Sequence, residues 1–362
     1  MMAKNIDKLS PAWQLFKLSD ENFVPLAMIL ELTRRCHLRC VHCYLDETQE
    51  PGDADELRRM RKEELTAKEW KGVLKQLADA GCMYLALTGG EVFLRPDTLE
   101  IAHYARELAF NVRIFTTAMH VNEEIAGELA AMGIDRVDVS LYGRKQTHAA
   151  VTRCARAFDR SVRGIKVLRA AGTRVAIKVP LMTLNAVDRH WLQDFAQELG
   201  ARCLFDPTLT PRNSGKKNNL EHRLPAAELD EIFADPRITT RDNLAAVEEF
   251  QSGEYEDYLC SAGRNSGAID PYGEVNPCLQ WPVKCGNIRG EAFKDIWHGS
   301  SVLREIRELK HRKQTTGSAA YCNNCPGLAY LESGDALQPA DYDMRVQDSV
   351  RAALGAAESD DG

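Results

Sequence analysis

Strand-like and helix-like segments alternate regularly over residues 26–205, and this alternation restricts the fold more than any other feature of the chain. Apolar runs of strand length and composition cover residues 26–32, 84–88, 111–116, 135–140, 174–179 and 201–205. Amphipathic helical patterns begin at Thr66 and cover residues 96–109, 123–132, 158–171 and 188–199. Strand–helix units in series build a parallel sheet with helices outside it. Because a closed barrel needs eight units, six units predict an α/β fold with a partial, TIM-like (β/α)6 barrel.

The composition is that of an ordinary globular protein. Hydrophobic residues make up 44% of the 362 residues and charged residues 27%, which excludes the disordered and collagen-like classes. No apolar run approaches the ~20 residues of a membrane-spanning helix, and the first residues lack the apolar core of a signal peptide. We therefore expect a cytoplasmic protein without a membrane partner. The net charge of −7 does not favour a nucleic-acid partner.

The alternation ends near residue 211, and a cysteine-rich unit follows. Within that unit, residues 270–273 read Asp-Pro-Tyr-Gly, which is the composition of a hairpin turn. We expect five regions, which are an N-terminal arm over 1–25, the barrel over 26–215, a linker with helices over 216–257, a smaller α+β domain over 258–335 and a C-terminal tail over 336–362.

Three of the 11 cysteines, Cys36, Cys40 and Cys43, follow the first expected strand. Because nothing suggests export, metal or redox ligation is a better interpretation than disulfide bonds. Three thiolates leave one coordination position open, as in a catalytic zinc site or a four-iron cluster with one distinct iron. The alternatives are three unrelated buried cysteines or a structural zinc site completed by His37 or His42. We expect neighbouring cationic groups to lower the pKa of the thiols; they are Arg34, Arg35, His37 and Arg39.

The Cys-x3-Cys-x2-Cys spacing after the first strand of a βα repeat resembles the radical S-adenosylmethionine (SAM) superfamily. The resemblance implies that Cys36, Cys40 and Cys43 hold a [4Fe–4S] cluster, and that the amino and carboxylate groups of SAM chelate its fourth iron. In that family an electron from the cluster cleaves SAM, and the resulting 5′-deoxyadenosyl radical abstracts hydrogen from the substrate. The resemblance thus implies an oxidoreductase with an electron donor such as flavodoxin or ferredoxin.

Residues at the ends of later strands resemble the SAM-contacting positions of the same family. Gly89, Gly90 and Glu91 look like the motif that contacts the methionyl amino group, with Glu91 as a support. A plain strand-ending turn is the alternative. Ser140 looks like the ribose-contacting position. Further candidates for the same mouth, at the ends of the third and fifth strands, are Thr116, Thr117 and Lys178.

A second group of cysteines lies in the C-terminal unit; it comprises Cys260, Cys278, Cys322 and Cys325. By spacing alone, two separated pairs of thiolates suit zinc and an iron–sulfur cluster equally well. The Cys-x12-Gly-x4-Cys hairpin after such a core resembles the SPASM and twitch domains, which implies one auxiliary [4Fe–4S] cluster on these four cysteines. Leu331 and Asp335 occupy positions where the longer SPASM pattern continues with cysteines, so the resemblance is to the shorter twitch arrangement.

Other reactive or charged residues have plainer interpretations. Cys285 is expected to be a spare thiol, although it could replace a ligand or leave one iron open to substrate. Cys82, Cys154 and Cys203 are expected in the core. A basic run after the last strand is expected either to be a solvated loop or to steer an acidic or carboxylated substrate. It comprises Arg212, Lys216, Lys217, His222 and Arg223.

The main functional hypothesis from the resemblance is oxidative modification, by cross-linking or a similar reaction, of a ribosomally made peptide or small protein. The alternative is oxidation or decarboxylation of a small molecule, such as a haem precursor or an amino-sugar alcohol. A zinc-binding interaction protein is a third hypothesis, from another class. Leu279 stands where the enzymes that make formylglycine have an aspartate base, which puts that reaction in doubt and leaves the catalytic residue unassigned.

Overall fold

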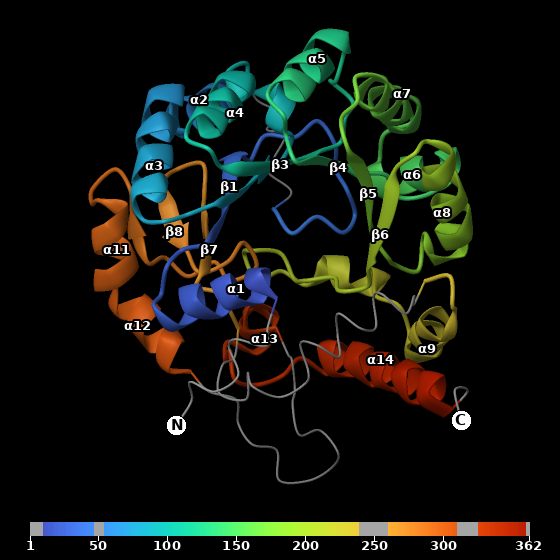
Figure 1. Cartoon of the computed structure of the whole chain (residues 1–362). Coiled ribbons are helices and arrows are strands. Elements are labelled where there is room, and N and C mark those ends of the chain that lie inside the picture. The colour runs from blue at the N-terminus through green and yellow to red at the C-terminus, as the bar shows by residue number, and fades with distance from the viewer. Residues whose placement is uncertain (1–9, 47–53, 239–259, 310–324, 360–362) are drawn as a thin grey trace.

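A nine-stranded sheet forms the centre of the protein (Figure 1). The computed structural model describes residues 10–46, 54–238, 260–309 and 325–359. In these residues the strands lie in the order β6-β5-β4-β3-β2-β1-β7-β8-β9. Their bounds are β1 Ala27–Thr33, β2 Tyr84–Gly89, β3 Asn111–Thr116, β4 Arg136–Ser140, β5 Val175–Pro180, β6 Arg202–Asp206, β7 Ser266–Ile269, β8 Glu274–Asn276 and β9 Gly286–Asn287.

Helices connect the strands and cover the outside of the sheet (Figure 1). In the first part of the chain they are α1 Pro11–Glu21, α2 Ala54–Glu63, α3 Ala67–Asp79, α4 Thr98–Glu107, α5 Glu123–Ala131, α6 Lys145–Thr152, α7 Ala157–Ala170 and α8 Arg189–Glu198. They continue with α9 Ala226–Ala234, α11 Phe293–Gly299, α12 Ser301–Glu308, α13 Pro326–Ser333 and α14 Asp341–Ser359.

Strands β1 to β6 confirm the predicted parallel alternation. They pair in parallel and in chain order, and each strand begins and ends within one residue of its predicted position. The predicted cap of α3 is also present, because the Thr66 hydroxyl accepts the Glu69 N–H and the Glu69 carboxylate accepts the Thr66 N–H. The six strands curve into an open, partial barrel (Figure 1), so that the carboxyl ends of β1 to β6 meet at one edge.

The C-terminal unit continues the barrel sheet and shares its core. Strand β7 pairs in parallel with β1, with Ile269 opposite Leu30, and β8 and β9 follow in antiparallel order. Trp297 of α11 is fully buried in the same hydrophobic cluster as Trp70 of α3. The Trp297 indole N–H donates to the Phe23 carbonyl at 2.7 Å. This α+β unit is therefore held to the barrel by a common core.

Both ends of the chain are more structured than the arm and tail that we expected. Residues 11–21 form α1, where the carboxylate of the buried Asp20 accepts the Nε–H of Arg264 from the C-terminal unit at 3.0 Å. Within residues 336–362, α14 spans Asp341–Ser359 instead of a tail, and its Ser349 hydroxyl donates to Asp230 of α9 at 2.7 Å. The contact with α9 explains the difference, because it stabilises α14 from outside its own sequence.

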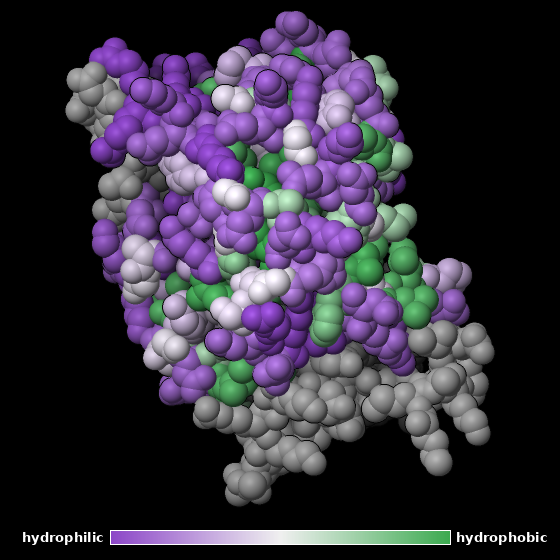
Figure 2. Space-filling model, turned by 90° about the vertical axis from the view of Figure 1, so that its left-hand side faces the viewer, coloured by the Kyte–Doolittle hydropathy of each residue, from purple (hydrophilic) through white to green (hydrophobic). Residues whose placement is uncertain are grey.

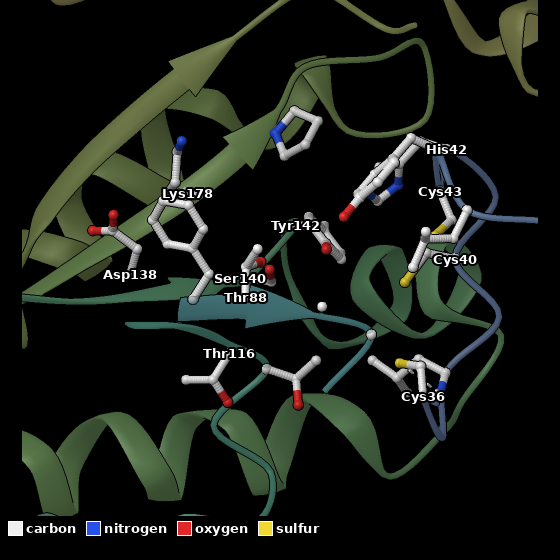
Figure 3. Close-up of a pocket in the computed structure, with 18 of the residues that line it drawn as sticks. Cys36, Cys40, His42, Cys43, Thr88, Thr116, Asp138, Ser140, Tyr142 and Lys178 are labelled. Atoms are coloured by element: carbon white, nitrogen blue, oxygen red, sulfur yellow. Dashed lines mark hydrogen bonds between the residues drawn. The ribbon is translucent and has the colours of Figure 1, made fainter. Parts of the chain in front are cut away.

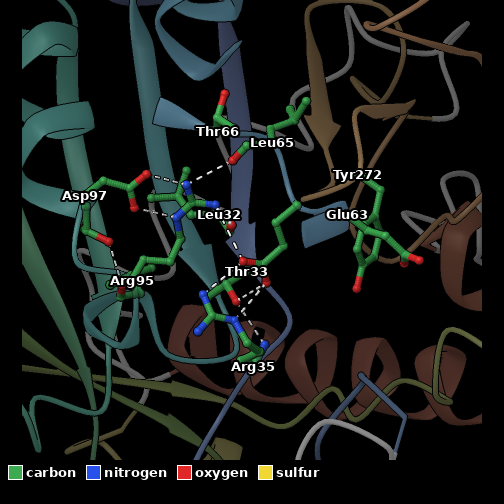
Figure 4. Close-up of polar contacts among 12 residues, drawn as sticks. Leu32, Thr33, Arg35, Glu63, Leu65, Thr66, Arg95, Asp97 and Tyr272 are labelled. Atoms are coloured by element: carbon green, nitrogen blue, oxygen red, sulfur yellow. Dashed lines mark hydrogen bonds and ion pairs between the residues drawn. The ribbon is translucent and has the colours of Figure 1, made fainter. Parts of the chain in front are cut away.

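A buried ionic network ties the barrel to the hairpin of the C-terminal unit (Figure 4). Glu64 is 4% exposed and accepts from the Thr33 hydroxyl at 2.5 Å and from the Arg35 guanidinium at 2.9 and 3.2 Å. Arg95 lies 3.7 Å from the same carboxylate. The next residue, Leu65, donates its N–H to the carbonyl of Pro271 in the hairpin turn at 2.7 Å. The network thus connects the end of β1 to the turn between β7 and β8.

The face of the molecule on which α3 and α11 lie is largely hydrophilic, and its apolar residues form separate small groups (Figure 2). In the part of the chain that the structure describes, no helix combines the length and apolar character needed to cross a membrane.

Candidate active site

The cysteines of the first group lie on the loop that follows β1 (Figure 3). Cys36 is buried, and Cys40 and Cys43 are half-buried. The Leu38 N–H donates to Cys36 Sγ at 3.4 Å, and the Cys43 N–H donates to the Cys40 carbonyl at 3.1 Å. All three cysteines line one cavity of about 260 Å³. The loop therefore brings the three predicted ligands to one wall of this cavity.

The end of α6 supports this loop from one side. The Arg39 N–H donates to the Thr152 carbonyl at 3.2 Å, and the Val41 N–H donates to the Val151 carbonyl at 3.0 Å. These bonds fix the segment between Cys36 and Cys43 in the manner of a short strand pairing, which limits how far the sulfurs can move.

Arg212 supports the loop from the other side. It is buried, and its guanidinium donates to the carbonyls of Cys43 at 3.1 Å and Leu45 at 2.7 Å. Arg223, from the same basic run, donates to the Leu209 carbonyl at 2.6 Å. The expectation of a solvated loop is wrong for these two arginines, because their guanidinium groups donate hydrogen bonds to backbone carbonyls of neighbouring segments.

The thiols sit in an apolar, crowded environment. Burial raises the pKa of Cys40 well above its ordinary value, and the adjacent thiolates of Cys43 and Cys36 raise it further. Burial also raises the pKa of Cys43. Thiols of this kind give up their protons when a metal centre binds, because the centre supplies the positive charge that the site lacks.

The expected lowering of these thiol pKa values by Arg34 and Arg35 is wrong. The Arg34 guanidinium turns away to Asp270 in the hairpin of the C-terminal unit at 3.0 Å. The Arg35 guanidinium turns to Glu64. Both arginines connect the loop to other segments instead of facing the sulfurs.

The donor set fits a centre with several metal atoms. Among the described residues, no three His, Cys, Asp or Glu side chains converge as closely as the ligands of a single ion do. The three thiols are instead spread along the cavity wall, with Cys36 apart from Cys40 and Cys43 (Figure 3). This spread suits a [4Fe–4S] cluster, in which each cysteine ligates a different iron.

Gly89 and Gly90 place a second loop directly against the backbone that leads to Cys36. A Cβ on Gly89, whose φ is +144°, would lie 2.1 Å from the Thr33 carbonyl oxygen. A Cβ on Gly90 would lie 2.3 Å from the Arg35 carbonyl oxygen. No side chain fits at either position, so the two glycines allow this close approach. Both glycines line the cavity.

Glu91 is fully buried and lies behind the cavity wall. Its carboxylate accepts from the Thr116 hydroxyl at 2.6 Å, the Thr117 N–H at 2.7 Å and the Phe93 N–H at 3.1 Å. These bonds fix the end of β3 relative to the loop after β2. Glu91 thus has the contacts of a supporting residue, whereas Thr116 and Thr117 themselves reach the cavity.

Ser140 and Lys178 complete the opposite wall of the cavity (Figure 3). Ser140 ends β4, and the Lys178 ammonium lies 5.1 Å from the centre of the Phe115 ring. Every residue that we predicted to contact SAM therefore lines this cavity, except Glu91. His42, which we considered only as a ligand of a structural zinc site, also lines the cavity. The sequence did not lead us to single out further lining residues, which include Tyr44, Asp138, Tyr142 and Asp206.

One part of the wall is aromatic and uncharged. The Tyr142 ring stacks on His148 with centroids 5.3 Å apart, and the Tyr142 N–H donates to His148 Nδ1 at 3.1 Å. The His42 ring meets Tyr142 edge-on at 4.8 Å. Burial lowers the pKa of both histidines to about 4, so both are neutral near pH 7.

Three cysteines of the second group lie near one another in the C-terminal unit. Cys260 and Cys278 share a small apolar cluster with Trp281. Burial raises the pKa of Cys325 to about 12, and the nearby thiolates of Cys260 and Cys278 raise it as well. The Cys325 N–H donates to Asp343 of α14 at 2.7 Å. Cys322, the fourth predicted ligand, lies outside the described residues.

The remaining cysteines occupy the core or its margin. Cys285 belongs to the main hydrophobic cluster, and its thiol donates to the Val283 carbonyl at 3.5 Å. Cys82 belongs to the same cluster, and Cys203 packs against it. Cys154 packs against the small apolar group around Cys36, which spacing in the sequence did not indicate.

Profiles of two known families match the chain. The profile of the radical SAM superfamily matches residues 30–199, and that of the SPASM iron–sulfur cluster-binding domain matches residues 260–326. These two matches contain the two cysteine groups in the same order as the fold does.

Two curated relatives are similar over most of their length. The AdoMet-dependent heme synthase of Methanosarcina barkeri is 29% identical over 88% of this chain and 96% of its own length. The mycofactocin maturase MftC of Mycobacterium tuberculosis is 28% identical over 84% of this chain and 78% of its own length.

Solved structures share the fold at lower identity. SuiB of Streptococcus suis, bound to its precursor peptide SuiA, is 20% identical with a TM-score of 0.65 and covers 84% of this chain and 74% of its own. The anSMEcpe structure with bound AdoMet is 14% identical with a TM-score of 0.67 and covers 91% of this chain and 96% of its own.

Proposed function

The chain belongs to the radical SAM superfamily and carries a C-terminal SPASM-type iron–sulfur cluster-binding domain, and from this premise we propose that it oxidatively modifies a ribosomally made peptide or small protein. The observation that carries the proposal is the size of the cavity. At about 260 Å³ it lies just below the range for small-molecule sites, so in our proposal SAM alone fills the enclosed space. The substrate then has to present one group at a time through the mouth, as a peptide side chain does.

We assign the metal ligands on the positions described above. Cys36, Cys40 and Cys43 hold the cluster that binds SAM. The auxiliary cluster is assigned to Cys260, Cys278, Cys322 and Cys325, and Cys285 is left as a spare thiol. When bound, the first cluster and SAM would supply a 5′-deoxyadenosyl radical for hydrogen abstraction. The auxiliary cluster would accept the electron that the substrate gives up on oxidation.

We assign the cavity wall to SAM recognition. Gly89 and Gly90 offer backbone groups to the methionyl end, because they bring main chain close to the backbone that leads to Cys36. Ser140 and Thr117 offer hydroxyls from the ends of two strands, and Lys178 offers a cation to a carboxylate. Glu91 holds the Thr117 backbone in place from behind the wall.

The two candidate substrate classes are a peptide, which presents one side chain to the mouth of the cavity, and a small molecule. The relative MftC supports the peptide class. A haem-type small molecule is the second candidate, and the heme synthase relative favours it because this chain spans 96% of that protein. An electron donor such as flavodoxin or ferredoxin and a cytoplasmic location complete the proposal.

The test is an anaerobic turnover experiment with reductant, SAM and one candidate substrate at a time. The candidates are short peptides encoded beside the gene and iron porphyrins with free carboxylates. We expect a peptide to lose hydrogen, seen by mass spectrometry, together with formation of 5′-deoxyadenosine. If only a porphyrin is consumed while every peptide returns unchanged, the peptide proposal is wrong and the second candidate replaces it.

A further inference from the structure

A second cavity, of about 340 Å³, lies at the amino ends of β3 to β6, whereas the candidate active site lies at the carboxyl ends of these strands. Among the residues that line it, five are arginines and one is an aspartate; they are Arg113, Arg136, Arg169, Arg174, Arg202 and Asp135. We call it the basal arginine cavity. Neither the proposed reaction nor the family matches give it a role.

The register of the sheet brings these arginines together. Arg113 on β3 is the register partner of Arg136 on β4. The Val137 N–H donates to the Arg174 carbonyl at 2.9 Å, which places Arg174 beside Arg136 at the start of β5. Register partners in a parallel sheet project from the same face, so these side chains form a row.

The carboxylates at the cavity do not balance the guanidinium groups. Asp135 pairs with Arg113 at 3.1 Å and with Arg174 at 2.5 Å, and Asp138 takes the Arg136 guanidinium at 2.6 Å. One lining carboxylate, Asp135, together with the neighbouring Asp138 thus has to balance five guanidinium groups, in a chain whose net charge is −7. Arg202 is exposed, and in the described part of the chain its side chain has no hydrogen-bonding or ion-pairing partner. The surplus positive charge is therefore local and open to a ligand.

The backbone makes room for this arrangement. Gly200 has a φ of +63°, and a Cβ there would lie 3.0 Å from an Arg169 guanidinium nitrogen. The Arg169 guanidinium uses this space to donate to the carbonyls of Thr173 at 2.9 Å and Leu199 at 3.3 Å. Arg169 is thus held rigidly at the cavity wall, which lowers the entropy lost when an anion binds.

We propose that the basal arginine cavity binds a small anion with two or more linked phosphate groups. Planar guanidinium groups match phosphate oxygens in pairs, and several of them around one concave site select multiply charged anions over chloride. The Arg136–Asp138 pair lies between the two cavities, because Asp138 also lines the candidate active site. The anion therefore binds apart from SAM, and the inference stands independently of the proposed reaction.

The test is calorimetric titration of tripolyphosphate into the cluster-loaded protein with SAM present in saturating amounts. We expect one binding site per chain. The double variant Arg174→Gln/Arg202→Gln should weaken binding by about tenfold or more, because each removes a charged hydrogen-bond donor. Both side chains are exposed, and melting without anion checks that the variant is folded. The matched control is Arg163→Gln, which lies exposed on α7 and should change the affinity by less than about twofold.

ATP in place of tripolyphosphate separates the two sources of linked phosphates. Equal affinities identify the phosphates alone as the recognised group, and tighter binding of ATP adds a nucleoside contact; both results support the site. Absence of tripolyphosphate binding up to millimolar concentration overturns the proposal. Equal weakening in the Arg163→Gln control and in the double variant overturns it as well, because it indicates only general attraction of anions to the surface.

Discussion

The two cysteine regions of this protein are built in opposite ways. Cys36, Cys40 and Cys43 lie on one short loop, which backbone bonds from α6 and the Arg212 side chain hold next to a cavity. Cys260 and Cys278 flank the β7–β8 hairpin and pack against the apolar cluster around Trp281, and Cys325 approaches them from a later segment of the chain. The first region is a local motif placed by the barrel, and the second exists only where the chain has already folded.

The difference separates chemical from structural roles. A loop that opens onto a cavity leaves a coordination position for a ligand, so loss of its metal centre should abolish the reaction and change stability little. A centre that joins distant segments restricts the unfolded chain as a cross-link does, so its loss should reduce stability as well as turnover.

The largest expected effect comes from the first region. The triple variant Cys36→Ala/Cys40→Ala/Cys43→Ala should abolish formation of 5′-deoxyadenosine from SAM under anoxic, reducing conditions, measured by chromatography. Its free energy of unfolding should stay within about 1 kcal/mol, because the loop keeps its backbone bonds. Cys154→Ala is the matched control, since Cys154 packs beside Cys36 but is not a predicted ligand. Retained cleavage in the triple variant would refute the assignment of this loop.

The second region should behave differently. Cys278→Ala should remove about four irons per chain, stop product formation, keep SAM cleavage largely intact and lower the free energy of unfolding by about 4 kcal/mol. Cys322→Ala should give the same loss of iron and product. Cys285→Ala is the control, because Cys285 packs in the main core and should leave the iron content unchanged. Unchanged iron content in Cys278→Ala would show that Cys278 is not a cluster ligand. Loss of iron in Cys285→Ala would show that Cys285 is one.

The link between the two regions can be broken separately. Glu64→Gln leaves the guanidinium groups of Arg35 and Arg95, which are 5–6% exposed, without their shared carboxylate. We expect the free energy of unfolding in urea to fall by about 3 kcal/mol, because Arg35 is then an uncompensated buried charge, whereas Arg95 keeps its ion pair with Asp97 at 2.6 Å. Glu63→Gln is the control, since that side chain is exposed. Equal effects of the two substitutions would show that the buried network does not stabilise the fold.

The barrel could be predicted closely from the sequence because its signals are local. Apolar runs and helical periods gave all six strands within one residue. The pairing of β7 with β1 could not be predicted, because Leu30 and Ile269 meet through the tertiary fold alone. The same holds for α14, which depends on its contact with Asp230. Local patterns thus predict elements, and long-range contacts decide how the two units join.

The candidate site also contains residues that local sequence patterns predict and residues that only long-range contacts place. The spacing of the cysteines pointed to the cysteine loop, and the resemblance to the radical SAM superfamily pointed to the glycine pair. Asp138 could have been found as well, because it lies two residues before Ser140 and therefore faces the same side of β4. Arg212 carried no such signal, since its contact with Cys43 crosses most of the barrel sequence. The side chains of Arg34 and Arg35 were misjudged because nearness in sequence does not fix the direction of a long side chain.

The smallest expected effect sharpens the comparison through pH. His148, in the α6 segment that supports the first cysteine loop, has its pKa lowered to about 4 by burial, against 6.5 in the unfolded chain. Between these values only the unfolded chain takes up the proton, so stability falls as the pH falls. From pH 7 to pH 5 this group alone should remove about 2 kcal/mol from the free energy of unfolding, measured in urea at each pH. His148→Asn keeps an acceptor for the Tyr142 N–H but cannot titrate, so its loss over the same range should be smaller by that amount. An equal loss of stability in the variant would show that groups other than His148 cause the acid sensitivity. The segment that supports the first cysteine loop would then not be its source.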